Sequence, residues 1–136
     1  MLLVRRRSAL YVPASNERAV EKSRNLPCDV VILDLEDAVA PEQKAVARDH
    51  AVASVRAGGF GTRELVVRVN GLDTAWGADD LAAVSAVAPA AILVPKISAA
   101  SDLAPYSRAL ETRNGTALWA MIETPMGIIN AREIAA

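Results

Sequence analysis

The fold of this chain is decided by the stretch LWAMIETP at residues 118–125. Its apolar first half predicts a strand over 117–123 that carries Glu123 at its carboxyl end. Thr124 suits a helix N-cap and Pro125 suits the first helical position, so a helix is predicted to begin directly after the strand. Parallel α/β folds keep their active sites at this end of their strands, which makes Glu123 a candidate site residue.

The same pattern of a strand followed by a helix fills the chain before this stretch. The run 30–36 is apolar apart from Asp34 and the terminal Glu36, which is typical of a strand buried on both faces. Gly58 and Gly59 end one long helix, and Pro89 ends another. The predicted strands are 8–14, 30–36, 64–70, 90–96 and 117–123, and the predicted helices are 16–26, 42–57, 78–87, 102–112 and 125–136.

This alternation predicts an α/β fold with a parallel sheet and right-handed crossovers. Either an eight-stranded (β/α)8 TIM barrel or an open doubly wound sheet would fit. Neither a Gly-x-Gly-x-x-Gly motif after the first strand nor a phosphate-binding loop occurs, which disfavours a nucleotide-binding sheet. A complete barrel needs about 250 residues. We therefore expect residues 1–136 to be the N-terminal part of a single TIM-barrel domain, with about the first five βα units.

Charged side chains end four of the predicted strands. They are Glu36 with Asp37, Arg68, Lys96 and Glu123. Because the carboxyl ends of barrel strands converge on one mouth, these residues are expected to share a site. Side chains alternate along a strand, and this phase predicts that Arg68, Lys96 and Glu123 all point into the mouth. For Lys96, the prediction puts its side chain on the same face as Ile92 and Val94.

The charged residues at the strand ends are of types that bind metal ions and small oxo-acids. Acidic groups from separate strands suit a hard cation such as Mg²⁺, which takes oxygen ligands and keeps positions open for substrate oxygens. Arg68 offers the planar fork that matches a carboxylate. A metal beside an arginine suits a small oxo-acid, whose carbonyl the metal would polarise to stabilise an enolate.

Structural roles for the same residues stay open at this point. Glu36 or Asp37 can pair with Arg68 in a purely structural bridge across the strand ends. Lys96 can be a structural counter-ion inside the barrel, and Asp34 can serve a structural hydrogen bond within its strand.

The composition of the chain limits which binding partners and which cellular compartment are expected. The 15 basic and 16 acidic side chains nearly cancel, so neither nucleic acid nor an anionic membrane is an expected partner. Apolar runs stop short of the roughly 18 residues that span a bilayer. The segment 1–7 places its apolar residues before its arginines, the reverse of a secretory signal. Cys28 is the single cysteine and excludes an internal disulfide. We therefore expect a cytoplasmic protein.

The order of motifs resembles a known family along essentially the whole chain. The motifs are RSALYVP at 7–13, VILDLEDAV at 31–39, VRVNG at 67–71, LVPK at 93–96 and MIETP at 121–125. They are similar to the motifs of citrate lyase beta-subunit-like proteins, which belong with malyl-CoA lyases in the HpcH/HpaI aldolase superfamily.

The resemblance implies a TIM barrel of the phosphoenolpyruvate-binding type and a Mg²⁺-dependent carbon-carbon lyase, with Mn²⁺ as a second possible metal. Such an oxo-acid-lyase cleaves or forms a 3-hydroxyacyl thioester such as citryl-CoA or malyl-CoA. The products are an acyl-CoA and a 2-oxo acid such as oxaloacetate, and the family suggests a homo-oligomer, either a trimer or a hexamer.

Roles for individual residues also follow from the resemblance. Glu123 matches the first protein ligand of Mg²⁺, and a second ligand, an aspartate, is expected beyond Ala136. Arg68 matches the clamp on the oxo-acid carboxylate. Glu36 and Asp37 match catalytic acidic groups that hold metal-bound waters or orient Arg68, and Lys96 is expected on the inner face, with the substrate-binding residues.

Two other functions fit the same residues. One is a metal-dependent aldolase that acts on free hydroxy-oxo-acids without CoA. The other is a non-catalytic half-barrel that binds or assembles with a partner, since open strand edges favour association.

Overall fold

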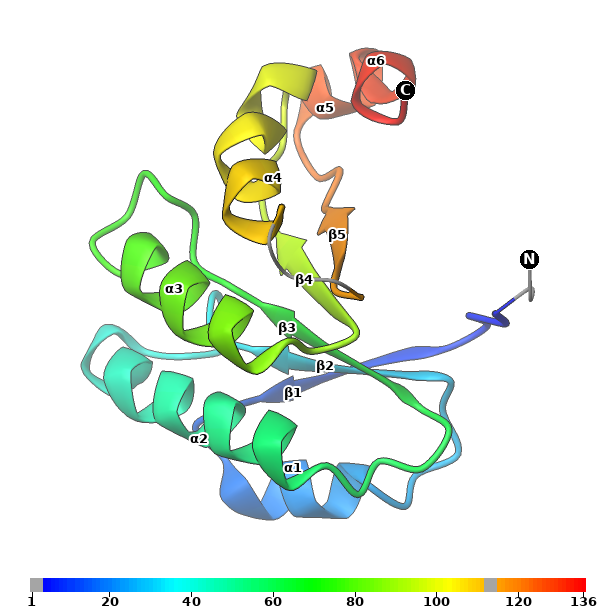
Figure 1. The fold of residues 1–136 in the computed structure, drawn as a ribbon, viewed down its shortest axis with the longest axis vertical. Coiled ribbons are helices and arrows are strands. Elements are labelled where there is room, and N and C mark those ends of the chain that lie inside the picture. The colour runs from blue at the N-terminus through cyan, green and yellow to red at the C-terminus, as the bar shows by residue number, and fades with distance from the viewer. Residues whose placement is uncertain (1–3, 112–114) are drawn as a thin grey trace.

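The computed structural model describes residues 4–111 and 115–136. Within them, strands and helices alternate from one end to the other (Figure 1). The strands are β1 (Ala9–Pro13), β2 (Val30–Asp34), β3 (Glu64–Arg68), β4 (Ala91–Val94) and β5 (Ala117–Ala120). The α-helices are α1 (Glu17–Ser23), α2 (Lys44–Ala57), α3 (Gly77–Val87), α4 (Ala104–Leu110), α5 (Pro125–Ile129) and α6 (Ala131–Ile134). Short 3-10 turns, Pro41–Gln43 and Ala100–Leu103, precede α2 and α4.

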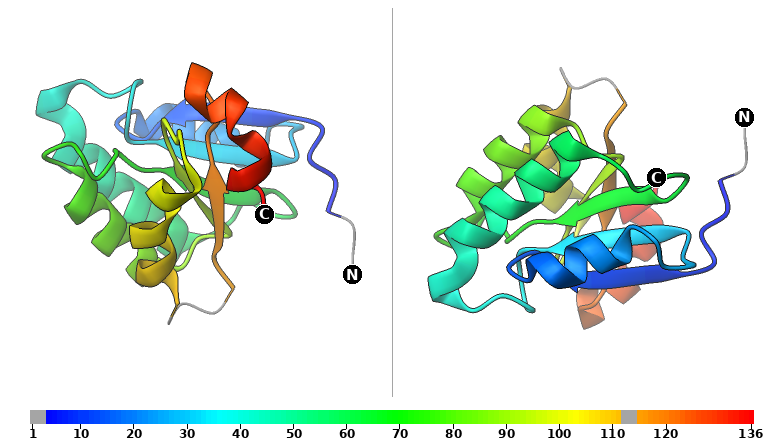
Figure 2. Two further views of the ribbon diagram at one scale, coloured as in Figure 1. Left: turned by 90° about the horizontal axis from the view of Figure 1, so that it is seen from above. Right: turned by 90° about the horizontal axis from the view of Figure 1, so that it is seen from below.

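The strands of the described residues form one parallel sheet in the order β1-β2-β3-β4-β5. Every neighbouring pair is parallel, so all five carboxyl ends lie at the same edge of the sheet. The register sets Asp34 at the end of β2 opposite Arg68 at the end of β3. Helices α1 to α4 lie on the convex side of the curved sheet (Figures 1 and 2). The predicted α/β fold, with the first five βα units of a TIM barrel, is confirmed.

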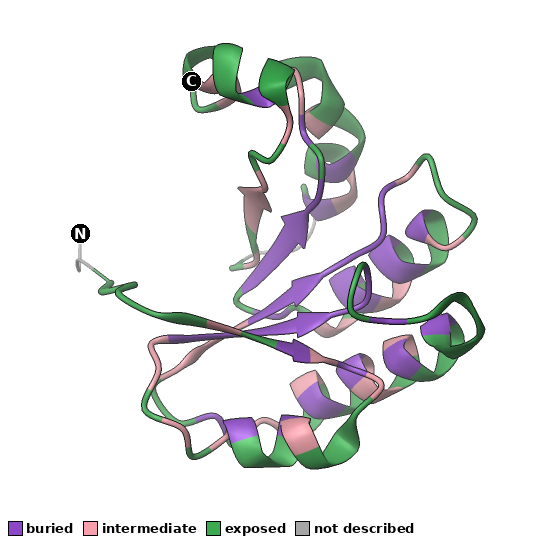
Figure 3. Ribbon diagram, turned by 180° about the vertical axis from the view of Figure 1, so that it is seen from behind, coloured by how far each residue is buried: buried purple, intermediate pink, exposed green. Residues whose placement is uncertain are grey.

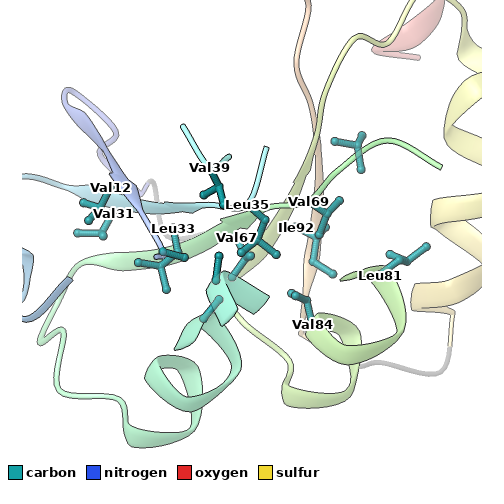
Figure 4. Close-up of a cluster of buried hydrophobic side chains, with 14 of the residues drawn as sticks. Val12, Val31, Leu33, Leu35, Val39, Val67, Val69, Leu81, Val84 and Ile92 are labelled. Carbon is teal, nitrogen blue, oxygen red and sulfur yellow. The ribbon is translucent and has the colours of Figure 1, made fainter. Parts of the chain in front are cut away.

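The main hydrophobic core lies between the sheet and these helices. Leu33 of β2, Val67 of β3 and Ile92 of β4 point from the strands toward helical side chains such as Val84 (Figure 4). A second, smaller cluster lines the concave side of the sheet and consists of Val30, Ile32, Val66, Ala91 and Leu93, with Trp119 and Met121 packed against it. In Figure 3 the central strands are buried, whereas the region around α5 and α6 is mostly exposed.

The predicted phase of β4 was wrong. Ile92 and Val94 belong to the core that faces the helices, whereas Leu93 belongs to the concave side. The strand ends at Val94, and Lys96 then adopts a left-handed backbone conformation with φ of 55°. This turn brings Lys96 back to the site, although strict alternation from Ile92 would have pointed it at the helices.

Element ends also differ from the prediction. The strands stop before Glu36, Lys96 and Glu123, which therefore lie in the loops that follow them. The helix predicted over 125–136 is divided at Asn130, which is the C-cap of α5 and the N-cap of α6. The predicted end of a helix at residue 112 lies outside the described residues. None of the helices described is long and apolar enough to cross a membrane.

Candidate functional site

Arg68 is the centre of the candidate site. Its side chain is only 7% exposed and meets Asp34 from the neighbouring strand, which is fully buried. Nε of Arg68 donates to one carboxylate oxygen of Asp34 at 2.7 Å, and Nη2 donates to the other at 2.6 Å. The β2–β3 register makes this pairing possible, because it sets the two residues side by side. Two parallel charge-assisted bonds fix the plane of the guanidinium group.

The remaining nitrogen of the Arg68 guanidinium is held less tightly. Nη1 lies 3.0 Å from Oε2 of Glu36 and 3.8 Å from Asp37. Oε2 of Glu36 is nevertheless buried and has no hydrogen-bond partner within residues 4–111 and 115–136, so the 3.0 Å approach is an ion pair that is poorly aligned for a hydrogen bond. The aligned acceptor of Nη1 is the sulfur of Met121 at 3.6 Å, which is a weak acceptor. The Tyr11 ring lies 5.1 Å from the guanidinium carbon.

Asp34 also shapes the turn that carries the other two carboxylates. One of its oxygens accepts from the backbone N–H of Glu36 at 2.9 Å, and the other accepts from that of Ala38 at 3.0 Å. Such bonds from an aspartate to the backbone two residues on are typical of turns. Asp34 therefore orients Arg68 and also fixes the loop from which Glu36 and Asp37 project.

The charge states of the central pair follow from these contacts. Burial opposes the charge on both side chains, but the mutual hydrogen bonds outweigh it. The pKa of Asp34 is held below its usual value by the hydrogen bonds of Arg68 and of the Glu36 backbone, despite burial. The pKa of Arg68 is raised, because the Asp34 hydrogen bonds outweigh its desolvation. The pair is therefore ionised at neutral pH.

Lys96 joins the cluster from the loop after β4. Its Nζ donates to Oε1 of Glu36 at 2.6 Å and lies 3.9 Å from Asp37. The Glu36 hydrogen bond raises the pKa of Lys96. The lysine side chain is 60% exposed and that of Glu36 only 8%, so Glu36 links the buried arginine to a cation at the surface of the mouth.

Glu123 lies at the same edge, directly after β5. Its Oε1 accepts a hydrogen bond from the backbone N–H of Lys96 at 2.8 Å, and the residue is exposed. The N-cap prediction is confirmed, because Oγ1 of Thr124 accepts from the N–H of Gly127 at 2.9 Å, and Pro125 opens α5. The sequence was therefore correct in placing a carboxylate at the tip of the fifth unit.

The donor set fits part of a magnesium site. Glu123 presents a solvent-facing carboxylate. Oε2 of Glu36 is buried and has no hydrogen-bond partner among the described residues, although it lies 3.0 Å from Nη1 of Arg68. Oxygen ligands of this kind suit Mg²⁺. Across residues 4–111 and 115–136, however, no group of three or more acidic, histidine or cysteine side chains is arranged to hold a metal. Among the described residues, Glu123 and Glu36 would supply carboxylate oxygens to such an ion.

A groove of about 270 Å³ adjoins the cluster. It is bounded by residues of the β2, β3 and β4 tips and by the loop before α3. Its charged and aromatic lining consists of Glu36, Asp37, Lys44, Trp76 and Lys96.

The structure thus brings together all the predicted site residues, with Arg68, Glu36, Asp37 and Lys96 in one charged cluster and Glu123 bonded to its edge. Sequence reasoning gave Asp34 a structural hydrogen bond but missed that it is the main partner of Arg68. The signal was present, because Asp34 and Arg68 hold equivalent positions in neighbouring predicted strands. Tyr11 was missed altogether, and no local pattern marked it.

A model of the HpcH/HpaI aldolase/citrate lyase family matches residues 7–136 of the chain. The chain belongs to this family. The match includes every residue of the charged cluster, so the resemblance noted from the motifs is confirmed.

The chain is also similar to individual members of this family, both in sequence and in structure. The chain is 46% identical over 130 residues to a (3S)-malyl-CoA thioesterase of Cereibacter sphaeroides, covering 96% of this chain and 45% of the relative. It is 36% identical over 138 residues to citrate lyase subunit beta of Escherichia coli, covering 96% and 46%. The crystal structure of CitE from Mycobacterium tuberculosis with magnesium, acetoacetate and coenzyme A is 33% identical, with a TM-score of 0.74, and the match covers 94% of this chain and 43% of that one.

The named relatives differ from one another in activity, and each is longer than this chain. The family includes both a lyase subunit and a thioesterase, so membership by itself does not choose between the two reactions. The chain spans about half the length of the curated relatives it matches.

Proposed function

We propose that this chain forms the N-terminal part of a single TIM-barrel domain of a Mg²⁺-dependent carbon-carbon lyase. The lyase cleaves or forms a 3-hydroxyacyl thioester such as citryl-CoA or malyl-CoA, with an acyl-CoA and a 2-oxo acid as the other partners. The names of its relatives support a thioester substrate, and the ligands of the CitE structure support an oxo-acid, coenzyme A and magnesium.

The observation that carries the proposal is the uneven bonding of Arg68. Asp34 occupies Nε and Nη2 with two short bonds, whereas in the part of the chain that the structure describes Nη1 has the Met121 sulfur as its one aligned acceptor. A guanidinium group that is fixed on one edge and weakly bonded at the other is prepared to accept a substrate carboxylate. In this proposal Arg68 clamps the carboxylate of the oxo-acid, and Lys96 adds a positive charge at the mouth.

Glu123 is proposed to hold the magnesium ion, together with an aspartate beyond Ala136. Mg²⁺ or Mn²⁺ at this position would polarise the oxo-acid carbonyl and stabilise the enolate. Glu36 and Asp37 lie on the Arg68 side and are proposed to hold water at the metal and to orient Arg68. The homo-oligomer suggested by the family, a trimer or hexamer, is part of the same proposal.

The test is an activity assay on the full-length protein with citryl-CoA and malyl-CoA, in the presence of Mg²⁺ and after its removal by a chelator. We expect a 2-oxo acid and an acyl-CoA in equal amounts, and only when the metal is present. Glu123→Gln should abolish this activity, whereas Glu133→Gln, a change in the last turn of the described chain, should leave it intact. Full activity of Glu123→Gln would refute the role of Glu123.

A second candidate function is hydrolysis of a malyl thioester, which the 46% identity to a malyl-CoA thioesterase favours. The same assay separates the two reactions. A lyase releases an oxo-acid and keeps the thioester bond, whereas a thioesterase releases free CoA thiol and no oxo-acid. An aldolase on free hydroxy-oxo-acids would instead work without CoA.

A further inference from the structure

Lys44, the first residue of α2, has contacts that the proposed reaction does not use. The residue is only 6% exposed. Its Nζ donates to the backbone carbonyl of Leu35 at 2.8 Å and to that of Glu36 at 2.6 Å. Both carbonyls lie just beyond the end of β2, so the ammonium group holds the backbone from which the Glu36 side chain projects.

The surroundings keep Lys44 in this position. The Trp76 ring, from the loop before α3, lies 5.3 Å from Nζ. The Leu35 carbonyl also accepts a bond of 2.9 Å from Nδ2 of Asn70, whose amide in turn is bonded to the buried Asp80 of α3. Burial lowers the pKa of Lys44, while the carboxylates around it favour its charge. The tip of β2 is therefore held by donors from two directions.

A lysine at this position is costly for the fold. Positive charge at a helix N-terminus is opposed by the helix dipole, and burial of an ammonium group removes its hydration. The cost is offset by the bonds to the two carbonyls and by the local excess of carboxylates. Among the described residues, the β2 tip has three carboxylates, Asp34, Glu36 and Asp37, which are paired with two cations, Arg68 of β3 and Lys96 of the loop after β4. Lys44 supplies the third positive charge.

We propose that Lys44 is a positioning residue of the site. It fixes the Leu35 and Glu36 carbonyls and thereby keeps the Glu36 carboxylate between Arg68 and Lys96. Glu36 then holds Arg68 from the side opposite the sheet pairing, at 3.0 Å from Nη1. The effect on turnover rests on the proposed function, whereas the effect on the position of Glu36 does not.

The first test is structural and independent of any activity. A crystal structure of the full-length protein with Lys44→Met, which keeps the length of the side chain but removes its charge and donors, should show the 35–37 segment displaced. The Glu36 carboxylate should no longer contact Arg68. Lys22→Met, at an exposed position of α1, is the matched control and should leave the site unchanged. A Glu36 that stays in place in Lys44→Met would overturn the proposal.

The second test separates positioning from general stability. If Lys44 acts through Glu36, Lys44→Met should lower kcat/KM by about tenfold or more in the wild-type background. In a Glu36→Gln background the same change should cost less than about twofold, because the two residues act as one unit. Equal losses in both backgrounds would show a structural role only and would overturn the positioning role.

Two further outcomes are also decisive. If Lys44→Met does not yield folded protein, Lys44→Gln, which retains one amide donor, replaces it in both experiments with the same expectations. If the wild-type protein has no lyase activity, the proposed function fails. The crystal structure then decides alone whether Lys44 holds Glu36 in place.

Discussion

Asp34 and Arg68 lie opposite each other at the ends of β2 and β3 and are joined by two hydrogen bonds of 2.7 and 2.6 Å. Both side chains are almost completely removed from solvent. The sheet register thus holds the charged guanidinium group of Arg68 in a fixed orientation at the carboxyl ends of the strands. A pair of this kind makes its partners depend strongly on each other, because an unpaired buried charge is much less stable than a paired one.

Replacement of Asp34 by asparagine should therefore destabilise the protein strongly. Asp34→Asn leaves Arg68 buried without its well-aligned carboxylate partner, and we expect a loss of about 3 kcal/mol in the free energy of unfolding. Urea denaturation of the wild-type protein and of Asp34→Asn measures this loss. Asp37→Asn is the control, because Asp37 is 65% exposed and 3.8 Å from Arg68, and its change should stay within about 0.5 kcal/mol. Equal effects of the two substitutions would contradict the prediction.

The same pair predicts a dependence of stability on pH. The pKa of Asp34 is lowered in the folded protein, so its contribution is fully present above the unfolded value of about 3.9. It is lost as the pH falls through the lower, folded pKa. The stability difference between wild type and Asp34→Asn should therefore be constant from neutral pH down to about pH 5, and should shrink below about pH 4. Urea denaturation curves of both proteins, recorded from neutral pH to below pH 4, measure this difference. A difference that grows on acidification would disprove the lowered pKa of Asp34.

Arg68→Lys should weaken binding of an oxo-acid even though it keeps the positive charge. A lysine offers no planar fork, so it cannot hold Asp34 with two bonds and present a further N–H to the substrate. We expect the Kd for pyruvate, measured by calorimetry on the full-length protein with Mg²⁺, to rise by roughly tenfold or more. Arg7→Lys, whose side chain is 72% exposed and pairs with Asp29, serves as the control. An unchanged Kd for Arg68→Lys would exclude the carboxylate clamp.

The backbone at Lys96 gives a prediction that is independent of its charge. With φ of 55°, Lys96 occupies the left-handed region, which glycine adopts without strain. Lys96→Gly and Lys96→Ala both lose the hydrogen bond to Glu36. The difference between their free energies of unfolding therefore reports the backbone strain alone. We expect the glycine variant to be more stable by about 1 kcal/mol in thermal or urea unfolding. Ala88, with φ of 49°, offers a matched comparison, since Ala88→Gly should stabilise as well. If Lys96→Ala were more stable than Lys96→Gly, the backbone at this position would not be strained.

The sequence was a good guide wherever a local rule determined the structure. The alternation of elements predicted the parallel sheet, and the Thr-Pro pair after Glu123 predicted the start of α5, because capping depends on neighbouring residues. Period-2 alternation failed at Lys96, since the chain leaves the strand at Val94 and turns through a positive φ that no residue type announces. The Asp34–Arg68 pairing and the Lys44 contacts depend on register and on packing between distant segments, which local patterns do not encode.

The charged cluster draws all its members from consecutive units, β2, β3 and the β4 loop. Each of its ion pairs is made between residues that lie within 34–96. The cluster is in this sense a self-contained module of neighbouring βα units. In terms of inheritance, a block of adjacent units of this kind can pass from one protein to another as a whole, with its ion pairs already made.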